Sequence, residues 1–488
     1  MLTSSEYSKY DALGLAGLVK RKEVSPTELL KSALALVARV NPKINALCNL
    51  SVEVARAAIA KGLPPGPFEG VPFLLKDLGA AAIGTPCSSG SRFFAGATAE
   101  HDAEIVARYR KAGLVIFGRT TSPEMGINPS TEAVVYGGPT RNPWNLNHSA
   151  GGSSGGAGAA VAAGILPMAH ASDGAGSIRI PAACDGLFGL KPSRGRMPLG
   201  PDMGEGWGGL LSQHVVSRTV RDSAAALDAT HGEDVGAPYA APPAPGIAYL
   251  DAIKTPPERL RIAFTDTTFE GGAIDPEVAH AVRSVAQACA GLGHSLEEAR
   301  PQIGLQEMLR PLMVVVATGT GAAIRARSRV LGRVPREDEL EPVTRGALEV
   351  SQTLTAADYL EAISTLHSLS RRVAHFFARY DVLLLPVLAE PPAVIGRFAM
   401  TQPDFMAYRL GTKGIAPYSP FTPLANMTGQ PAASLPLAWS QSGLPIGIQI
   451  ITRFGDEVTL LKLAAQLEAV QPWFDRRPGL GADQAADS

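Results

Sequence analysis

Two short runs of small residues in the second quarter of the chain constrain its fold and chemistry more than any other feature. Residues 151–156 read GGSSGG and residues 172–181 read SDGAGSIRIP, so each run holds a serine, Ser153 or Ser177, close to glycines. Glycines beside a serine leave room for a substrate carbonyl, and the neighbouring backbone N–H groups are free to hold an anion. The two runs therefore indicate serine-based hydrolysis.

A lysine upstream supplies a candidate base. Residues 71–76 read VPFLLK, so Lys76 closes an apolar run that predicts a buried strand. An ordinary lysine, with a pKa of about 10.4, is a poor base at neutral pH, but burial among apolar side chains disfavours its charged form. We expect neutral Lys76 to take a proton from Ser153, which takes one from Ser177 as that serine attacks a carbonyl. The plainer interpretation is a surface lysine at the end of a strand.

Composition narrows the class of protein. Hydrophobic residues make up 45% of the 488 residues and charged residues 18%, which is typical of a globular chain. The net charge is −1 and basic residues do not cluster, so neither nucleic acid nor a membrane is an expected partner. The four cysteines are widely spaced, which argues against a disulfide framework or a Cys-x-x-Cys metal site. We expect no metal and no cofactor.

The chain carries no segment typical of a targeting or membrane-spanning sequence. The first ten residues are polar, and the longest apolar stretches, such as 157–169, are too short to cross a bilayer. We therefore expect a soluble, cytoplasmic protein.

Helical and strand patterns alternate along the chain. Strands are expected at 71–75, 114–117, 165–169, 259–264, 381–386, 432–436 and 446–451, and helices at 27–40, 103–112, 155–164, 276–292, 304–378 and 458–467. Apolar strands between helices predict an α/β fold, with a single large mixed, mostly parallel β-sheet covered by helices on both faces. A capping box at 25–28 begins the first helix, and Pro42 is expected to end it.

The domain organisation is expected to be simple. We predict one domain over residues 1–488, with a helical cap at about 300–378 that shapes the substrate site. Residues 119–152 are rich in Thr, Ser, Pro, Asn and Gly and predict a long functional loop. The polar tail, 479–488, is expected to fray.

Two common glycine motifs fit the first serine run poorly. It contains Gly-x-Ser-x-Gly in two registers, around Ser153 and Ser154, which would suit the nucleophile elbow of an α/β-hydrolase. Residues 156–158 read GAG, part of a dinucleotide-binding fingerprint. Both motifs need an apolar strand just before the glycines, and residues 142–150, NPWNLNHSA, do not read as a strand.

Taken together, these runs and several others resemble the amidase signature family, whose members hydrolyse amides and some esters. The resemblance covers most of the chain. It rests on the two serine runs, on Lys76, and on the segments EMG at 124–126, TRNPW at 140–144, GLFGLKP at 186–192, FTPLAN at 421–426, GQP at 429–431 and LPIGIQ at 444–449.

The resemblance implies a role for each site residue. By position, Ser177 is similar to the family nucleophile and Lys76 to the family base, and Ser153 to the bridging serine, which follows a cis peptide in the family. The N–H groups of Gly174, Ala175, Gly176 and Ser177 would form the oxyanion hole; the family more often has glycine where Ala175 stands, and its methyl group is expected to restrict the turn. Met125 and Gly126 lie in the family's substrate loop and are expected to bind substrate.

Three polar residues near the nucleophile have competing interpretations. Asp173 and Arg179 flank Ser177, and we expect this charged pair to fix the backbone rather than to act in catalysis. His170 would suit a Ser–His hydrolase, but a buried, hydrogen-bonded strand residue is the simpler interpretation.

The substrate is expected to be a small amide. Residues 313–323 of the cap are apolar and small, which suits a hydrophobic or aromatic group. The SDGAGSIRIP run is similar to the branch with aryl acylamidases and 6-aminohexanoate cyclic-dimer hydrolases, although near Val316 the chain lacks the cysteine of the latter. We expect cleavage of the C–N bond of small linear amides through an acyl-enzyme on Ser177.

Other functions stay open. Carbamate (urethane) and ester hydrolysis use the same acyl chemistry. A subunit of glutamine-dependent tRNA amidotransferase typically has glutamine where Ile180 stands, and a non-catalytic relative would not need all three catalytic positions. Whether the chain forms a homodimer is likewise open.

Overall fold

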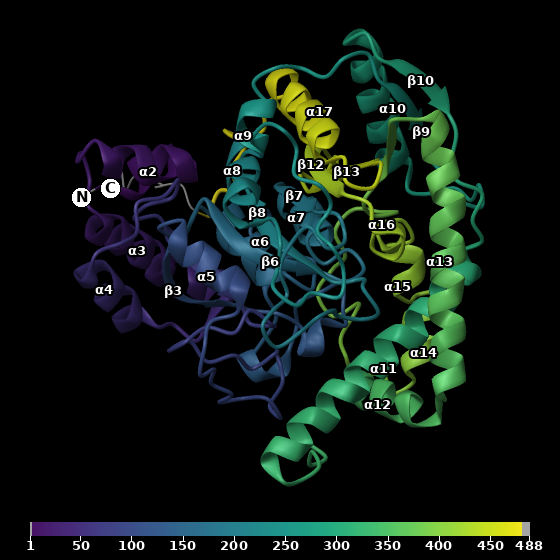
Figure 1. Ribbon diagram of the computed structural model, residues 1–488, viewed down its shortest axis with the longest axis horizontal. Helices are drawn as coiled ribbons and strands as arrows, with labels where there is room; N and C mark the ends of the chain where they lie inside the picture. Colours follow the sequence, from purple (N-terminus) through teal and green to yellow (C-terminus); the bar gives the residue numbers. More distant parts are fainter. Residues whose placement is uncertain (1, 481–488) are drawn as a thin grey trace.

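A mixed eight-stranded sheet runs through the middle of the molecule (Figure 1). The computed structural model describes residues 2–480, so most of the tail predicted to fray lies outside the described residues. The order of the sheet is β10-β9-β11-β13-β12-β7-β8-β6. Its strands are β6 Met168–Asp173, β7 Phe188–Lys191, β8 Ser212–Ser217, β9 Arg261–Phe264, β10 Ser295–Glu298, β11 Val382–Pro386, β12 Ala432–Trp439 and β13 Pro445–Thr452.

The α/β class and the mixed sheet are confirmed, but the expectation of mostly parallel strands is wrong. Only the pairs β10–β9 and β9–β11 are parallel among the described strands of this sheet, and the pairs from β11 through to β6 are antiparallel. An apolar run indicates that a strand is buried on both faces, but it does not indicate whether the strand runs parallel or antiparallel to its neighbours. The link between β12 and β13 is too short for a parallel crossover, which takes a dozen or more residues.

The single large sheet is confirmed, but the strand that ends in Lys76 lies outside it, in a small second sheet. β2 Pro72–Lys76 belongs to a three-stranded sheet of order β1-β3-β2, with β1 Leu47–Cys48 and β3 Val115–Thr120. β2 packs beside β6, but the Lys76 backbone N–H donates to His170 Nδ1 (3.1 Å). The His170 side chain thus accepts from a backbone N–H of β2 that would otherwise be available to pair with β6.

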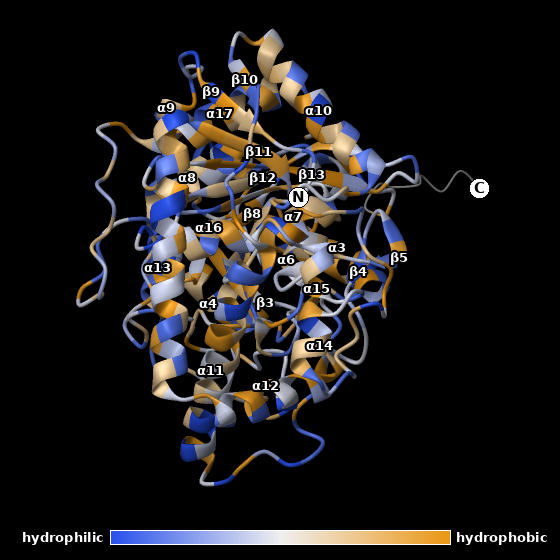
Figure 2. Ribbon diagram, turned by 90° about the vertical axis from the view of Figure 1, so that its right-hand side faces the viewer, coloured by the Kyte–Doolittle hydropathy of each residue, from blue (hydrophilic) through white to orange (hydrophobic). Residues whose placement is uncertain are grey.

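Helices cover both faces of the large sheet. Along β11, Val382 and Leu384 belong to a core that includes α10 and α17, whereas Leu383 and Leu385 belong to a core that includes α11 and α13. This alternation is expected of a strand, since successive side chains point to opposite faces. Figure 2 shows the apolar strands enclosed by helices. The helices are α1 Ser4–Ser8, α2 Ala12–Lys20, α3 Pro26–Ile44, α4 Val52–Lys61, α5 Glu104–Lys111, α6 Gly155–Ala162, α7 Arg179–Asp185, α8 Val220–Thr230, α9 Tyr249–Ala252, α10 Pro276–Gly291, α11 Leu305–Leu331, α12 Pro342–Thr353, α13 Ala356–Arg379, α14 Phe405–Leu410, α15 Ile415–Tyr418, α16 Pro423–Thr428 and α17 Glu457–Val470.

The first predicted helix begins as expected and ends later. Ser25 caps α3 by accepting from the Glu28 N–H, and the Glu28 carboxylate accepts from the Ser25 N–H (2.9 Å), which confirms the capping box. Pro42 was expected to end the helix, but it lies inside α3. The helix instead ends at Ile44, where Asn45 adopts a left-handed conformation with φ 49°.

The segment expected to form a cap consists mainly of three helices, α11, α12 and α13, at one side of the molecule (Figure 1), and both α12 and α13 pack on α11. By length and composition α11 is apolar enough to cross a membrane. However, 61% of its most apolar window is buried inside the structure, as in a core helix. The assignment of this segment as a cap on a single domain stays a prediction.

Residues 119–152 are mostly irregular, as predicted, with two short 3-10 turns, Glu124–Gly126 and Val134–Tyr136. The segment 142–150 is an exception, because β5 Asn145–Ser149 pairs with β4 Arg141–Asn142. This hairpin is peripheral and polar, so it is not the central strand that a nucleophile elbow needs. The strand expected at 165–169 lies further on, as β6, and runs directly into the second serine run.

Candidate active site

Lys76 is completely buried and reaches the first serine run. It is the last residue of β2, and its side chain is 0% exposed. Lys76 Nζ lies 2.7 Å from Ser153 Oγ and 3.0 Å from Ser172 Oγ. Burial lowers the pKa of Lys76 to about 7, against the attraction of the Asp173 carboxylate. The amine is thus largely neutral above pH 7 and can accept a proton from the Ser153 hydroxyl.

The two serine runs lie against each other. The peptide bond between Gly152 and Ser153 is cis, and α6 begins two residues later. The Ser154 N–H donates to the Ser177 carbonyl (3.3 Å), and the Ser154 hydroxyl donates to the Ser172 carbonyl (3.2 Å). These bonds hold the loop that carries Ser153 beside the loop that carries Ser177.

Ser177 is partly exposed and lines a cavity. Between residues 2 and 480, no hydrogen bond joins the Ser177 and Ser153 hydroxyls, so the predicted proton relay is assembled only as far as the Lys76–Ser153 pair. Ser177 therefore faces the space that a substrate would fill, whereas Lys76 and Ser153 lie behind it.

An ion pair fixes the turn that carries Ser177. Both carboxylate oxygens of Asp173 accept from Arg179 at 3.0 Å, and they also accept from the N–H groups of Gly176 (2.6 Å) and Ile178 (3.1 Å). Burial alone would raise the pKa of Asp173, but Arg179 outweighs burial and brings the pKa down to about 2. Both residues are completely buried, so their contacts fit the expected structural role.

The predicted oxyanion hole needs one correction. The Gly176 N–H donates to Asp173 and is not free to bind an oxyanion, contrary to our expectation. Among the described residues, no protein acceptor takes the N–H of Gly174, Ala175 or Ser177, so these three remain candidates. Ala175 does not adopt a positive φ, so its methyl group imposes no strain on the turn.

Gly176, by contrast, has φ +129°, and a Cβ there would lie 2.3 Å from Thr422 Oγ1. We expect Gly176→Ala to lower kcat/KM by about 100-fold, because the turn would shift the neighbouring amides and losing one oxyanion donor costs that much. Ala175→Gly is the matched control and should retain activity within about tenfold, since glycine accepts the same backbone. Steady-state kinetics with melting curves separates this loss from unfolding. Wild-type kcat/KM in Gly176→Ala would show that the turn is not the anion site.

His170 is not available as a base. Its Nδ1 accepts from the Lys76 backbone N–H (3.1 Å), and its Nε2 lies 3.1 Å from Gln213 Oε1. Burial, together with the charge of Lys76, lowers the pKa of His170 to about 3, so the ring is neutral. With both ring nitrogens engaged, His170 is the buried, hydrogen-bonded strand residue that the sequence favoured.

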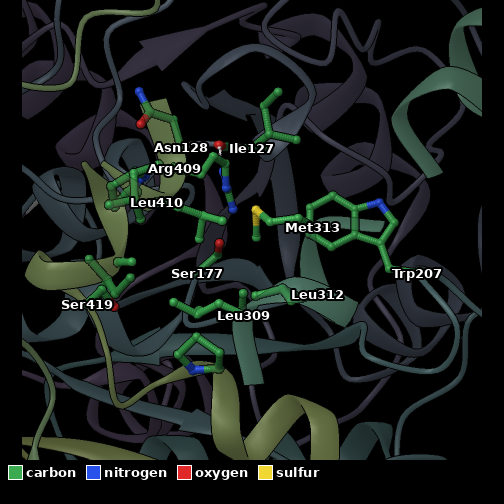
Figure 3. Close-up of a pocket in the computed structure, with 18 residues that line it drawn as sticks. Ile127, Asn128, Ser177, Trp207, Leu309, Leu312, Met313, Arg409, Leu410 and Ser419 are labelled. Atoms are coloured by element: carbon green, nitrogen blue, oxygen red, sulfur yellow. Dashed lines mark hydrogen bonds between the residues drawn. The ribbon is translucent and has the colours of Figure 1, made fainter. Parts of the chain in front are cut away.

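The empty space in front of Ser177, with the open solvent at its mouth included, is about 540 Å³, and Figure 3 shows Ser177 near its centre. Gly126 lines it, as expected of the substrate loop, whereas Met125 is not among its lining residues. The lining is mostly apolar: Ile127, Pro129, Ala175, Ile180, Trp207, Leu309, Leu312, Met313, Leu410, Ile415, Ala416 and Pro423, with Gly126, Gly152 and the polar residues Asn128, Ser177, Arg409 and Ser419.

Most of the cavity-lining residues, and Ser172 beside Lys76, were not predicted from the sequence. Ser172 contacts Lys76, yet nothing separates it from any other serine in an SDG run. Trp207 lies in a glycine-rich segment, GEGWGG at 204–209, which was a signal that we overlooked. Arg409 had no sequence signal at all. Over residues 2–480, no group of three or more His, Cys, Asp and Glu residues could hold a metal ion.

Known proteins resemble the chain over nearly its whole length. The model of the Amidase family matches residues 28–461. The 6-aminohexanoate-cyclic-dimer hydrolase of Paenarthrobacter ureafaciens is 38% identical over 479 residues, which cover 96% of each chain. A solved structure of 6-aminohexanoate cyclic dimer hydrolase complexed with substrate has 37% identity and a TM-score of 0.91, and covers 97% of this chain and 100% of that one. A solved bacterial aryl acylamidase of the amidase signature family has 28% identity and a TM-score of 0.86, and covers 97% and 99%.

Proposed function

The chain belongs to the amidase family of hydrolases that act on C–N bonds, and from this premise we propose that it cleaves small, hydrophobic or aromatic linear amides through an acyl-enzyme on Ser177. The observation that carries the proposal is the buried Lys76 amine, 2.7 Å from Ser153, directly behind a cavity that Ser177 lines.

The reaction needs only groups that this site holds. Neutral Lys76 takes the Ser153 proton, Ser153 takes the Ser177 proton, and Ser177 Oγ forms a bond to the substrate carbonyl carbon. The candidate N–H groups of Gly174, Ala175 and Ser177 stabilise the negative oxygen. Ser153 then protonates the leaving nitrogen, the C–N bond breaks and the amine departs, and Ser153 takes its proton back from Lys76, which is neutral again. Water repeats these steps on the acyl-enzyme and releases the acid.

The apolar cavity lining supports hydrophobic substrates. Leu309, Leu312 and Met313 of α11 line the cavity together with Trp207, which lies beside Met313 in Figure 3. An aliphatic or aromatic group would replace water against these side chains. No cysteine is among the described lining residues. Val316, the position near which a cysteine was looked for, is completely buried and does not line the cavity. Carbamates and esters share the acyl chemistry and remain alternatives. The expected cytoplasmic location stays a prediction.

A substrate panel tests the proposal. We would assay the purified protein with acyl anilides, aliphatic amides, aryl carbamates, p-nitrophenyl esters, 6-aminohexanoate cyclic dimer and L-glutamine. We expect anilides and esters with longer apolar acyl chains to give a kcat/KM at least about tenfold above that of the acetyl compounds, since each buried CH₂ adds affinity. Ammonia release from glutamine alone would instead favour a tRNA amidotransferase subunit. No turnover of any compound would contradict the proposal.

A further inference from the structure

A single charged side chain lines the mostly apolar cavity in the described part of the chain. Arg409, near the end of α14, is 6% exposed and shares the cavity with Ser177. Figure 3 shows its guanidinium directed into the cavity rather than away from it. Charged side chains are rarely this buried unless they are paired, so the partners of Arg409 need an explanation.

The protein itself only partly satisfies Arg409. One guanidinium nitrogen, Nη1, donates to the Ile127 carbonyl, and the side chain lies over the Phe405 ring (5.6 Å). Nε is buried with no acceptor, and no carboxylate forms an ion pair with Arg409 among residues 2–480. Although burial lowers its pKa, the value is about 10, so Arg409 is charged at neutral pH. A buried charge with a single neutral acceptor is strongly destabilising, and an incoming anion would relieve it.

Neighbouring polar groups do not compete for this charge. Asn128 donates to Ser130 Oγ (3.1 Å) and to the Phe398 carbonyl (2.8 Å), and its Oδ1 accepts from the Tyr408 hydroxyl (2.7 Å). The Ser419 hydroxyl is bonded to Thr422 Oγ1 at 2.9 Å. Apart from the catalytic turn at Ala175 and Ser177, Arg409 is thus the polar residue of the described cavity wall with hydrogen-bonding capacity left for a ligand.

We propose that Arg409 is a specificity-determining residue that selects amides carrying a carboxylate a few bonds from the scissile carbonyl. The planar guanidinium fork matches the two oxygens of a carboxylate, and the apolar walls would enclose the chain that joins carboxylate and amide. This inference rests on the proposed function, and it narrows the substrate class to amphipathic amides with one anionic end. The carboxylate can belong to the acyl or to the amine part of the substrate.

Two matched pairs of substrates test the proposal and distinguish the two positions. On the acyl side, glutaranilic acid is compared with 5-methylhexananilide, in which an isopropyl group replaces the carboxylate. On the amine side, 4-acetamidobenzoate is compared with 4-isopropylacetanilide. In at least one pair we expect wild type to favour the carboxylate compound by about tenfold or more in kcat/KM, because a buried charge pair with good geometry adds net affinity.

Variants separate recognition from a structural role. Arg409→Gln should lower the ratio of kcat/KM between the paired substrates by about 30-fold or more, as for loss of one partner of a buried charge pair. Arg409→Lys should restore part of it. If Arg409 only binds the Ile127 carbonyl, Arg409→Gln should lower kcat/KM equally for both substrates of a pair, and their ratio should stay unchanged. Lys413→Gln removes an exposed cation outside the cavity lining and should leave the ratio as in wild type.

The outcomes are distinct. Turnover of the neutral anilides with no carboxylate preference in either pair overturns the inference and leaves the proposed function standing. If no amide or ester is cleaved, the proposed function fails, and calorimetric titration of wild type with glutaranilic acid decides the binding question. If Arg409→Gln does not fold, competitive inhibition of wild-type ester hydrolysis by glutarate and by benzoate decides it. Absence of both binding and inhibition at millimolar concentrations would overturn the inference.

Discussion

Ser177→Ala is expected to abolish turnover of every amide and ester substrate while leaving the fold intact. Ser177 lies on the cavity side of the turn that Asp173 and Arg179 fix. Its hydroxyl makes no hydrogen bond within the described residues. The substitution should therefore remove the nucleophile without removing a contact that stabilises the fold. Losing a nucleophile typically lowers kcat by a factor of about a million, so kcat/KM should fall at least about 10⁴-fold. Steady-state kinetics, with circular dichroism and melting curves, measures this.

A second hydroxyl in the same cavity serves as the control. Ser419 lines the cavity and bonds to Thr422, and Ser419→Ala should keep kcat/KM within about tenfold of wild type, as expected for loss of one ordinary hydrogen bond. Residual activity of Ser177→Ala above about a hundredth of wild type would place the nucleophile elsewhere, since the remaining groups cannot supply that much rate.

Activity is expected to rise with pH through about 7 and then to level off. Burial lowers the pKa of Lys76 to about 7, so below that pH the amine is protonated and cannot accept the Ser153 proton, and above it the amine is neutral. Lys76→Ala should remove this ascending limb and most of the rate. Amides should lose more than activated esters, because a leaving nitrogen needs a proton through Ser153 and an aryloxide does not. pH–rate profiles on an anilide and a p-nitrophenyl ester of the same acid measure both effects.

A second buried lysine provides the matched control. Burial also lowers the pKa of Lys191 to about 7, but its Nζ donates to the Pro192 carbonyl (2.7 Å) and not to a serine of the site. Lys191→Met should therefore keep the ascending limb that Lys76→Ala loses. Equal losses on anilide and ester in Lys76→Ala, with an unchanged profile, would make Lys76 structural. His170 could not replace it, since both its ring nitrogens are engaged.

Local patterns predicted the individual elements of the fold better than their pairing. The capping box located the start of α3, and the apolar run at 381–386 located β11, because both signals depend on neighbouring residues. Strand direction depends on connections across the whole chain, and β7 and β8, which carry antiparallel pairs, were not recognised as strands. β8 reads SQHVVS, and its polar side chains are buried, which hides the strand from any hydrophobic pattern.

The candidate site divides in the same way. Lys76, Ser153 and Ser177 each stand in a distinctive run. In the structure, Lys76 contacts Ser153, and the loop that carries Ser177 lies beside this pair. The apolar run at 313–323 pointed to the cavity wall, and its first residue, Met313, does line the cavity. The other walls come from segments far apart in the sequence, so no local signal marks Arg409, Leu309 or Leu312 as partners of Ser177. The engagement of the Gly176 N–H by Asp173 likewise depends on the exact path of the turn, and composition alone cannot reveal it.

Trapping the acyl-enzyme tests the central claim most directly. The protein is mixed with a p-nitrophenyl ester of an apolar acid, quenched in acid within the first turnover, and analysed by intact mass and peptide mapping. We predict a mass increase of one acyl group on wild type, located at Ser177, and none on Ser177→Ala. An acyl group on another residue would contradict the account. Rapid turnover without any covalent adduct on the protein, from either the ester or a fluorophosphonate probe, would contradict it as well.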